Sequence, residues 1–280
     1  MAVLAHPDDE SLGFGGVLAR YAAEGVETFL VTATRGDRGR FGAHRLGEPG
    51  HPGSAEIGRI RERELRAAAR ELSVRELTIL GYPDAALDQV EPREIIGRIA
   101  EQMRRARPQV VMTFPHDGAY GHPDHVAISQ FTTAATVMAA DPAWRAAGAA
   151  DLPPHAVSKL YVMVSDEAKW DDYQSAFKKL TAMVDGVERV AMPWARWSIS
   201  AEIDTRAHWR TVWKAASHHE SQIANFERLH ALTPEQHESL WGRQTFYRVF
   251  STVNGGRALE RDLFEGLRTP AAVPDHEEKR

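Results

Sequence analysis

The sequence predicts an α/β fold: a Rossmann-like, doubly wound, mostly parallel sheet with helices on both faces, followed by a C-terminal extension. Up to about residue 165, short apolar runs alternate with longer segments of helical periodicity, the order of elements typical of parallel α/β sheets. The runs are continuously apolar, as expected of strands buried on both faces. A chain of 280 residues that is 43% hydrophobic is also long enough for a substantial core.

The first part of the chain gives each element in turn. Strands are expected at residues 1–5, 27–34, 77–82, 110–114 and 160–164, and helices at 11–23, 56–73, 93–106 and 125–140. The first strand begins at Met1, which is short for a central strand and is what a chain lacking a few upstream residues would show. Ligands of such sheets bind beyond the carboxyl ends of the strands, where the strand order reverses.

The alternation weakens in the second part of the chain. A helix is expected at 167–182, short strands at 188–192 and 199–204, and a helix at 205–224. The sequence TPEQ at 233–236 is a capping-box pattern, which predicts a short helix from that point. We expect one domain over residues 1–267, with a core of about 1–165, an extension of about 166–267 that partly walls the site, and a flexible tail at 268–280.

Composition narrows the classes of function. The chain contains no cysteine, so any metal must be held by His, Asp or Glu. A net charge of -5 with mixed signs argues against a nucleic-acid partner. No run is long enough to span a membrane and no signal segment precedes the first strand. We therefore expect a cytoplasmic enzyme with a small-molecule substrate, and a homo-oligomer is compatible with the sequence.

Two polar clusters follow predicted strands. In HPDDE, a turn at Pro7 would let His6 and Asp9 converge while Asp8 projects separately. A second cluster, GHPDH, follows the strand at 110–114 and supplies further histidines, His122 and His125. Two histidines and one carboxylate with an open coordination position are typical of a catalytic zinc site, where the bound water is acidified. Asp8 then remains as an unassigned acid beside the metal.

Arg61 carries a separate signal. On the predicted helix 56–73, Arg61 and Glu64 fall inside the apolar arc instead of on the exposed face. A half-buried ion pair between the two, at a spacing of i and i+3, would explain this without any functional role.

The motifs AHPDDE and GHPDH together resemble the PIG-L or LmbE-like deacetylases, which are zinc-dependent hydrolases that remove acetyl groups from N-acetylglucosaminyl substrates. The resemblance covers about residues 1–140 and becomes weaker beyond them. It includes three further segments, VTATRGDRGR, the helix from Arg59 and LGYPDAAL, and more faintly HESQ at 219–222. The resemblance implies an N-deacetylase acting on an amino-sugar conjugate. It further implies roles for individual residues: zinc ligands His6, Asp9 and His125, general base Asp8, oxyanion-stabilising His122 and its charge partner Asp124, and sugar-binding Arg61 and Asp84.

Physical chemistry agrees with these implied roles. Amide hydrolysis needs a nucleophile, a polarised carbonyl and a proton for the leaving amine, which zinc and Asp8 would provide. A protonated His122, kept charged by Asp124, would stabilise the oxyanion. Tyr120, at the mouth of the site, would add a phenol donor.

Three alternatives remain at this level. An amidase of the same family that cuts a larger amide on a sugar–thiol conjugate would carry the same zinc centre. A non-haem iron oxygenase uses two histidines and one carboxylate, and iron(II) would also fit a deacetylase site of this composition. The third alternative is a sugar-binding module with an inactive centre. The presence of Asp8, which could act as a base, argues against it.

Overall fold

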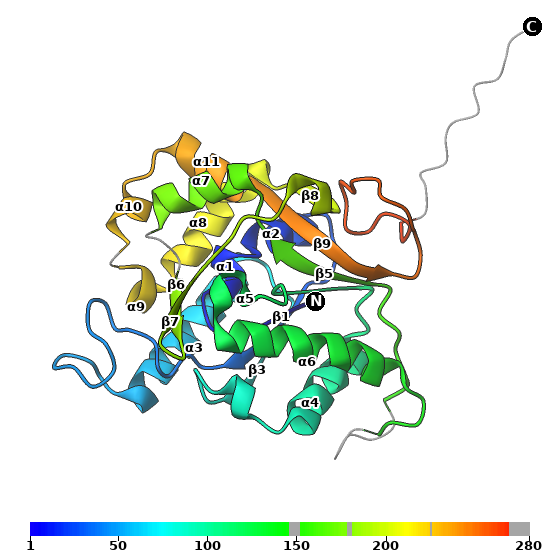
Figure 1. Ribbon diagram of the computed structural model, residues 1–280, viewed down its shortest axis with the longest axis horizontal. Helices are drawn as coiled ribbons and strands as arrows, with labels where there is room; N and C mark the ends of the chain where they lie inside the picture. Colours follow the sequence, from blue (N-terminus) through cyan, green and yellow to red (C-terminus); the bar gives the residue numbers. More distant parts are fainter. Residues whose placement is uncertain (146–151, 178–180, 225, 269–280) are drawn as a thin grey trace, which may run out of the picture.

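The computed structural model describes residues 1–145, 152–177, 181–224 and 226–268, which form an α/β fold around a seven-stranded sheet (Figure 1). The strand order is β3-β2-β1-β4-β5-β9-β8. The first five strands along the chain are parallel, and β9 runs antiparallel to both β5 and β8. The predicted fold class is therefore confirmed. The strands are β1 (Ala2–Leu4), β2 (Phe29–Thr34), β3 (Glu76–Tyr82), β4 (Val110–Thr113), β5 (Lys159–Val164), β8 (Ala201–Asp204) and β9 (Arg243–Ser251).

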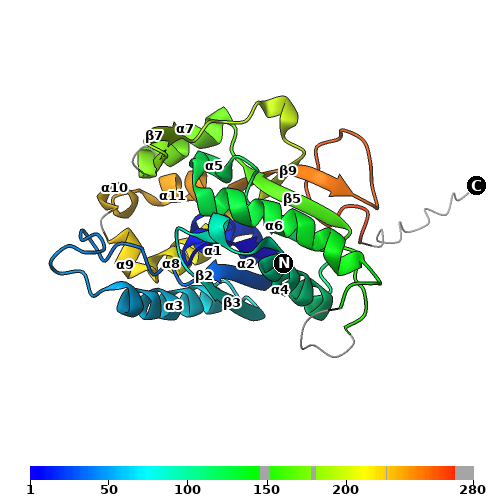
Figure 2. The same ribbon diagram turned by 60° about the horizontal axis from the view of Figure 1, so that its bottom comes forward.

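Helices cover both faces of the sheet (Figure 2). Helices α4 (Pro92–Ala106) and α6 (Pro123–Ala140) pack side by side on one face, and α2 (Gly15–Ala23), α3 (Ser54–Glu71) and α8 (Trp209–Ser217) pack on the other. A separate hairpin, β6 (Thr181–Val184) and β7 (Val187–Val190), lies outside the main sheet and contacts α5. The α-helices are α1 (Asp9–Leu12), α2 (Gly15–Ala23), α3 (Ser54–Glu71), α4 (Pro92–Ala106), α5 (Gly118–Gly121), α6 (Pro123–Ala140), α7 (Glu167–Ala176), α8 (Trp209–Ser217), α9 (Glu220–Ile223), α10 (Glu227–His230) and α11 (Pro234–Trp241). Short 3₁₀ turns are η1 (Leu87–Gln89), η2 (Arg196–Ser198) and η3 (Arg206–His208).

Strand β1 lies at the centre of the sheet and at the point where the strand order reverses. Its three residues are fully buried, and Ala2 pairs with Leu30 of β2 on one side and Met112 of β4 on the other. The segments that follow β1 and β4 therefore emerge next to each other at the carboxyl edge. HPDDE follows β1 and GHPDH follows β4, so the topology brings the two motifs together.

Several expected helices are shorter or broken. The helix predicted at 11–23 is two helices, α1 and α2, separated at Gly13 and Phe14. The one predicted at 167–182 ends at Ala176, and the strand β6 begins at Thr181. The helix predicted at 205–224 divides into η3, α8 and α9. The capping box is confirmed, with Thr233 and Gln236 bonding each other's backbone at the start of α11. Of the tail expected at 268–280, all but Arg268 lies outside the described residues.

Strand β9 was not predicted, although it joins the sheet between β5 and β8. It begins two residues after the end of α11 and carries two arginines and a glutamine among its apolar residues. Phe246 in its first half is fully buried, whereas Tyr247 and Val249 are exposed. Because β5 covers one edge of β9 and β8 the other, the strand belongs to the sheet despite its polar residues.

A buried charge network ties the C-terminal segment to β5. Glu260 is 1% exposed and accepts from Lys159 Nζ at 2.7 Å and from Arg248 Nη1 at 2.8 Å. Its second oxygen accepts from Tyr161 Oη at 2.5 Å. These cations and hydrogen bonds hold the pKa of Glu260 below its usual value, against the opposing effect of burial. The carboxylate thus compensates two cations, one of which, Lys159, is fully buried.

Replacing Glu260 with glutamine should lower the free energy of unfolding by about 3–5 kcal/mol, because it leaves the buried Lys159 ammonium without a counter-charge. Urea unfolding followed by circular dichroism measures this change. Glu76→Gln, at an exposed position at the start of β3, is the matched control and should have little effect. A Glu260→Gln protein as stable as the control would show that the network contributes no net stability.

Candidate active site

The turn after β1 separates the two aspartates of HPDDE. Asp9 Oδ2 accepts from the backbone N–H groups of His6, at 2.7 Å, and Ala5, at 3.2 Å. Its carboxylate therefore lies back against the end of the strand, beside the His6 ring. Asp8 has φ of 109°, in the region that favours glycine, and its side chain leaves the turn in another direction, toward Arg61.

The second motif supplies His125 from the first turn of α6. The ring is 2% exposed and stacks on Phe114, with ring centroids 3.8 Å apart. Its Nδ1 lies 3.3 Å from the carbonyl oxygen of Gly118, which indicates that Nδ1 carries the proton. The opposite nitrogen, Nε2, is then free to bind a metal and faces His6.

The candidate ligand atoms of His6, Asp9 and His125 lie close together, with the two histidines nearest to different oxygens of Asp9; we call this group of three residues the ligand triangle. His6 Nδ1 is 3.3 Å from His125 Nε2 and 3.6 Å from Asp9 Oδ2, and His125 Nε2 is 3.5 Å from Asp9 Oδ1. A tetrahedral ion with bonds of about 2.0–2.2 Å separates its ligand atoms by about 3.3–3.6 Å. All three residues are buried. The donor set and its spacing therefore fit a divalent metal with three protein ligands.

Two further carboxylates lie behind His6 and orient its ring. His6 Nε2 is 3.1 Å from Asp124 Oδ2 and 3.2 Å from Asp84 Oδ1. A carboxylate partner on the far nitrogen leaves Nδ1 for the metal and makes the imidazole a better ligand. Asp124 is held in turn by the backbone N–H groups of Ala85, at 2.7 Å, and Leu87, at 3.1 Å.

The hydrogen bonding of Asp124 differs from the expected pairing with His122, although its charge still raises the pKa of that ring. The carboxylate of Asp124 contacts His6, and only its backbone N–H contacts His122, donating to Nδ1 at 3.2 Å. His122 is the N-cap of α6, which explains this bond, because the first N–H groups of a helix need acceptors. Burial, together with the neighbouring His6 and His125, lowers the pKa of His122 to about 4. This lowered pKa, and the bond that Nδ1 accepts, favour a neutral imidazole with its proton on Nε2 over the protonated form expected from the sequence.

His6, His122 and Asp124 also lie close enough to form a group that could hold a metal. However, the Nδ1 atom of His122 accepts from a backbone N–H, and both oxygens of Asp124 are already bonded to backbone N–H groups. The triangle of His6, Asp9 and His125 therefore remains the better metal site.

Asp8 is held by Arg61, which is 4% exposed. Arg61 Nη2 donates to Asp8 Oδ2 at 3.1 Å and to the Pro7 carbonyl at 2.5 Å, and Nη1 donates to the Gly36 carbonyl at 3.0 Å. Burial raises the pKa of Asp8 to about 6, although Arg61 opposes the shift and Asp9 adds to it. A carboxylate with such a pKa is suited to exchange protons near neutral pH.

The alternative Arg61–Glu64 ion pair is not formed. Both oxygens of Glu64 accept from Ser221, at 2.8 Å from its N–H and 2.7 Å from its hydroxyl. The Arg61 guanidinium instead fits against Gly36, where an added Cβ would overlap Nη1. Asp84 approaches Arg61 Nη1 at 3.9 Å and accepts from the backbone N–H of Arg38 at 3.0 Å. Asp84 thus contacts the ligand triangle through His6, and Arg61 lies next to it through Asp8.

Tyr120 and the β6–β7 hairpin lie next to Gly121, His122 and His125 of the second motif. The Tyr120 ring lies edge-on to His122 and His125, at centroid distances of 5.9 and 5.3 Å. The side chain of Arg189, in β7, fills the space above Gly121, where an added Cβ would be 2.6 Å from its Cδ. The C-terminal extension therefore contributes a wall beside GHPDH.

The sequence analysis did not predict the contact between Glu10 of HPDDE and His219 of the C-terminal extension. His219 Nε2 contacts Glu10 Oε1 at 2.7 Å, and both side chains are fully buried. The faint HESQ resemblance pointed to the right segment, but nothing in the sequence indicated its contact with HPDDE.

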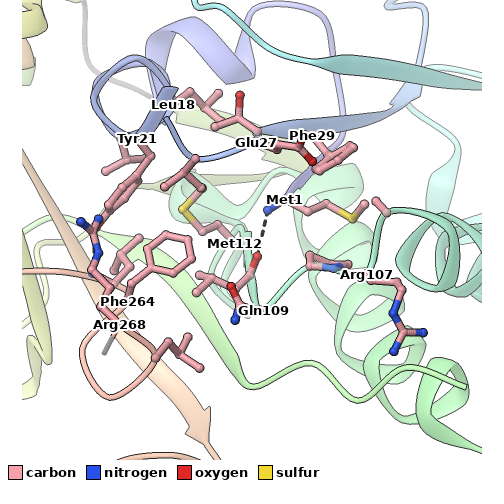
Figure 3. A pocket seen from close by; sticks show the side chains of 18 residues that line it. Met1, Leu18, Tyr21, Glu27, Phe29, Arg107, Gln109, Met112, Phe264 and Arg268 are labelled. Carbon is pink, nitrogen blue, oxygen red and sulfur yellow. Dashed lines mark hydrogen bonds between the residues drawn. The ribbon is translucent and has the colours of Figure 1, made fainter. Parts of the chain in front are cut away.

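A separate cavity of about 490 Å³ lies at the amino edge of the sheet, away from the metal cluster (Figure 3). Met1, Phe29 and Met112 line it together with Phe264, and the backbone nitrogen of Met1 donates to the carbonyl of Val110 at 2.8 Å. Helix α2 and the segment 263–268 complete its lining beside the residues at the start of β1, β2 and β4, so it lies at the opposite edge from HPDDE and GHPDH.

Comparison with known proteins agrees with the geometry of the cluster. Residues 1–136 match the family model described as PIG-L: GlcNAc-PI de-N-acetylase. The 1D-myo-inositol 2-acetamido-2-deoxy-alpha-D-glucopyranoside deacetylase of Streptomyces griseus is 33% identical, over 95% of this chain and 88% of its own length. The chain belongs to the PIG-L family. The resemblance inferred from the two motifs, and the expectation of a deacetylase-type enzyme that hydrolyses amide bonds, are confirmed.

Solved structures share the fold of this PIG-L family protein. The conserved protein TT1542 from Thermus thermophilus is 26% identical, with a TM-score of 0.62 over 92% of this chain and 98% of its own. The N,N'-diacetylchitobiose deacetylase from Pyrococcus horikoshii is 18% identical, with a TM-score of 0.62 over 89% of this chain and 83% of its own, and supports the fold alone. Among the described residues, no helix of this PIG-L family protein has the length and hydropathy that a membrane crossing requires.

Proposed function

We propose that this protein is a zinc-dependent hydrolase that removes the N-acetyl group from an N-acetylglucosaminyl-type conjugate. The observation that carries the proposal is the triangle of His6, Asp9 and His125 with a separate carboxylate, Asp8, next to it in the chain. The substrate class is supported by the Streptomyces griseus relative, whose name gives an acetamido-sugar linked to inositol.

His6, Asp9 and His125 would hold the ion, which when bound supplies a Lewis acid for the acetamide carbonyl and lowers the pKa of water. Asp8 acts as general base: it takes a proton from the attacking water as the new C–O bond forms. The same carboxyl returns that proton to the sugar nitrogen as the C–N bond breaks, leaving acetate and the free amine. Arg61 keeps the Asp8 carboxylate turned in one direction through its Nη2 contact.

His122 stabilises the oxyanion as a neutral hydrogen-bond donor. Its Nδ1 accepts from the Asp124 N–H, so the proton lies on Nε2. A neutral imidazole at a helix N-terminus can donate to developing negative charge without first being protonated. Tyr120, whose ring lies against His122 and His125, adds a phenol at the same side of the cluster.

Arg61 and Asp84 act at the boundary between the metal cluster and the sugar. Both are buried and already bonded within the protein. If they contact sugar hydroxyls, they must do so through donor and acceptor positions that these protein bonds do not use. The Nε atom of Arg61 has no partner among the described residues, but it is buried against Gly36, so the remaining capacity for sugar hydroxyls lies with the other guanidinium nitrogens and the Asp84 carboxylate.

A panel of N-acetylglucosamine derivatives, including an inositol conjugate, a chitobiose and a thiol conjugate with a larger acyl group, tests the proposal. The protein is loaded with Zn²⁺ or Fe²⁺, and the free amine and the acid are quantified. We expect acetate release from at least one acetylated sugar and none after chelation. Cleavage of the larger amide alone would indicate the amidase alternative, and no turnover with either metal would contradict the proposed function.

The rate should also fall at acid pH, because Asp8 must be ionised to accept a proton. Burial raises the pKa of Asp8 to about 6, and a bound dication opposes its protonation, so the midpoint of the acidic limb should lie at or below pH 6. Below the midpoint, kcat/KM should fall by about tenfold per pH unit. Metal content is measured at each pH, and a rate that stays level until the metal itself is lost would contradict the assignment.

A further inference from the structure

Glu10, the last acid of HPDDE, forms a buried pair with a histidine 209 residues further along the chain. Glu10 Oε1 lies 2.7 Å from His219 Nε2, and neither side chain is exposed. His219 lies between α8 and α9, in the C-terminal extension. The pKa of His219 is raised by Glu10 despite its burial, and that of Glu10 is lowered by His219. The two side chains therefore compensate each other's charge.

The second oxygen of Glu10 holds the backbone of Asp8. Glu10 Oε2 accepts from the Asp8 N–H at 3.0 Å, and Oε1 also accepts from the Ser11 hydroxyl at 2.5 Å. Asp8 has φ of 109°, a backbone conformation that a residue with a Cβ adopts only when its surroundings enforce it. Glu10 is the side chain that bonds the Asp8 N–H in this conformation, so it supports the backbone from which the Asp8 carboxylate reaches Arg61.

The metal ligand in the same motif is fixed independently. Asp9 Oδ2 is bonded to the N–H groups of His6 and Ala5, and His6 is oriented by Asp84 and Asp124. Neither set of contacts includes Glu10 or His219. Disturbing this pair should therefore move the base without removing the metal ligands.

The turn that carries His219 is anchored to two other parts of the core. Ser221 bonds Glu64 of α3 through its N–H and its hydroxyl. Its carbonyl accepts from the Gly42 N–H at 2.9 Å, and Gln222 Nε2 donates to the Arg40 carbonyl at 2.7 Å, so the turn also holds the long loop that projects in blue in Figure 1. Residues 219–222 are thus bonded to HPDDE, α3 and this loop at once.

We propose that Glu10 and His219 are positioning residues for the general base, through which the turn at 219–222 fixes the Asp8 carboxylate relative to the metal site. The proposal rests on the proposed role of Asp8. His219 holds Glu10, Glu10 holds the N–H of Asp8, and Asp8 keeps the backbone conformation that separates its side chain from Asp9.

Two substitutions at His219 with a neighbouring control test the pair. The amide nitrogen of glutamine can reach about where imidazole Nε2 lies, whereas that of asparagine matches Nδ1. His219→Asn should therefore lose the bond to Glu10, and His219→Gln should keep it. His218 is exposed and adjacent, so His218→Asn is the matched control. All three proteins are loaded with Zn²⁺, and kcat, KM, zinc affinity and the melting temperature are measured.

We expect kcat of His219→Asn to fall by about 10- to 100-fold, the scale of a misplaced reacting group, with KM and zinc affinity close to those of the wild type. His219→Gln should recover most of kcat, and His218→Asn should equal the wild type. A parallel loss of zinc affinity and kcat in His219→Asn, or an undiminished kcat, would contradict the positioning role. So would an equal loss of kcat in His219→Gln and His219→Asn.

Crystal structures of the wild type and His219→Asn add a measurement that requires no turnover. We expect the Asp8 N–H to lose its bond to Glu10 in the variant and the Asp8 carboxylate to shift, with Asp9 unchanged. An unchanged Asp8 would contradict the positioning role even if the protein were inactive on every sugar. Inactivity of the wild type, with Asp8 shifted as expected in the variant, would contradict only the proposed deacetylase function.

Discussion

Replacing Asp8 with asparagine should lower kcat for deacetylation by about 10²- to 10⁴-fold, the usual contribution of a general base, while the protein keeps its metal. Asparagine preserves the shape of the side chain and can still bond Arg61 through its oxygen, but it cannot take the proton from water. The ligands His6, Asp9 and His125 are unaffected by the change. Amine release and elemental analysis on the same sample measure the two quantities.

Asp88→Asn provides the control, since Asp88 is an exposed acid in η1. It should match the wild type in rate and in metal content. An Asp8→Asn enzyme with the rate of the wild type would remove the general base from the mechanism. Loss of metal in Asp8→Asn would instead mean that Asp8 belongs to the ligand set.

Replacing each histidine of GHPDH with alanine should affect a different quantity, metal content in one variant and kcat in the other. His125→Ala removes one corner of the ligand triangle, so metal content should fall well below the ratio of about one ion per chain expected of the intact site. His122→Ala should keep the metal and lose about 10²- to 10³-fold in kcat, the scale of one missing oxyanion donor. Elemental analysis after dialysis and steady-state rates separate the two effects.

Added Zn²⁺ distinguishes the variants further. Excess metal should restore part of the activity of His125→Ala, and it should not change His122→Ala. Equal loss of metal in both variants would favour the alternative group of His6, His122 and Asp124. In that case the two histidines would exchange roles.

The parallel core was predictable because its signals are local. Each of the first five strands is a continuous apolar run, and each is followed by a segment of helical periodicity. Strand β9 gave no such signal, because Arg243, Gln244 and Arg248 interrupt it. Gln244 bonds Val17 and Gly13 in the interior, and Arg243 and Arg248 bond Asp166 and Glu260. Most of these partners lie far away in sequence, so nothing in the sequence indicated that the polar residues of β9 would be bonded within the protein.

The candidate site was likewise predictable where its signals are local in the sequence and not where they depend on distant contacts. The spacing within each motif predicted that His6 and Asp9 converge, and the topology of parallel strands brought His125 to them. Which acid lies behind which histidine could not be read from the spacing, because Asp84 arrives from the end of β3 and bonds the same His6 nitrogen as Asp124. The lowered pKa of His122 depends on its burial and on the neighbouring His6 and His125, and the bond at its Nδ1 depends on the cap geometry of α6; these are tertiary properties.

The attachment of residues 219–222 to HPDDE has a consequence for biosynthesis. A ribosome releases the chain from its N-terminus, so the three candidate metal ligands, His6, Asp9 and His125, emerge long before His219. Strand β9, which lies between β5 and β8 in the sheet, emerges later still. The contact between Glu10 and His219 spans 209 residues, so it cannot form until residue 219 has been synthesised. The residues that would hold the metal are therefore synthesised well before the residue that, in our proposal, positions the base.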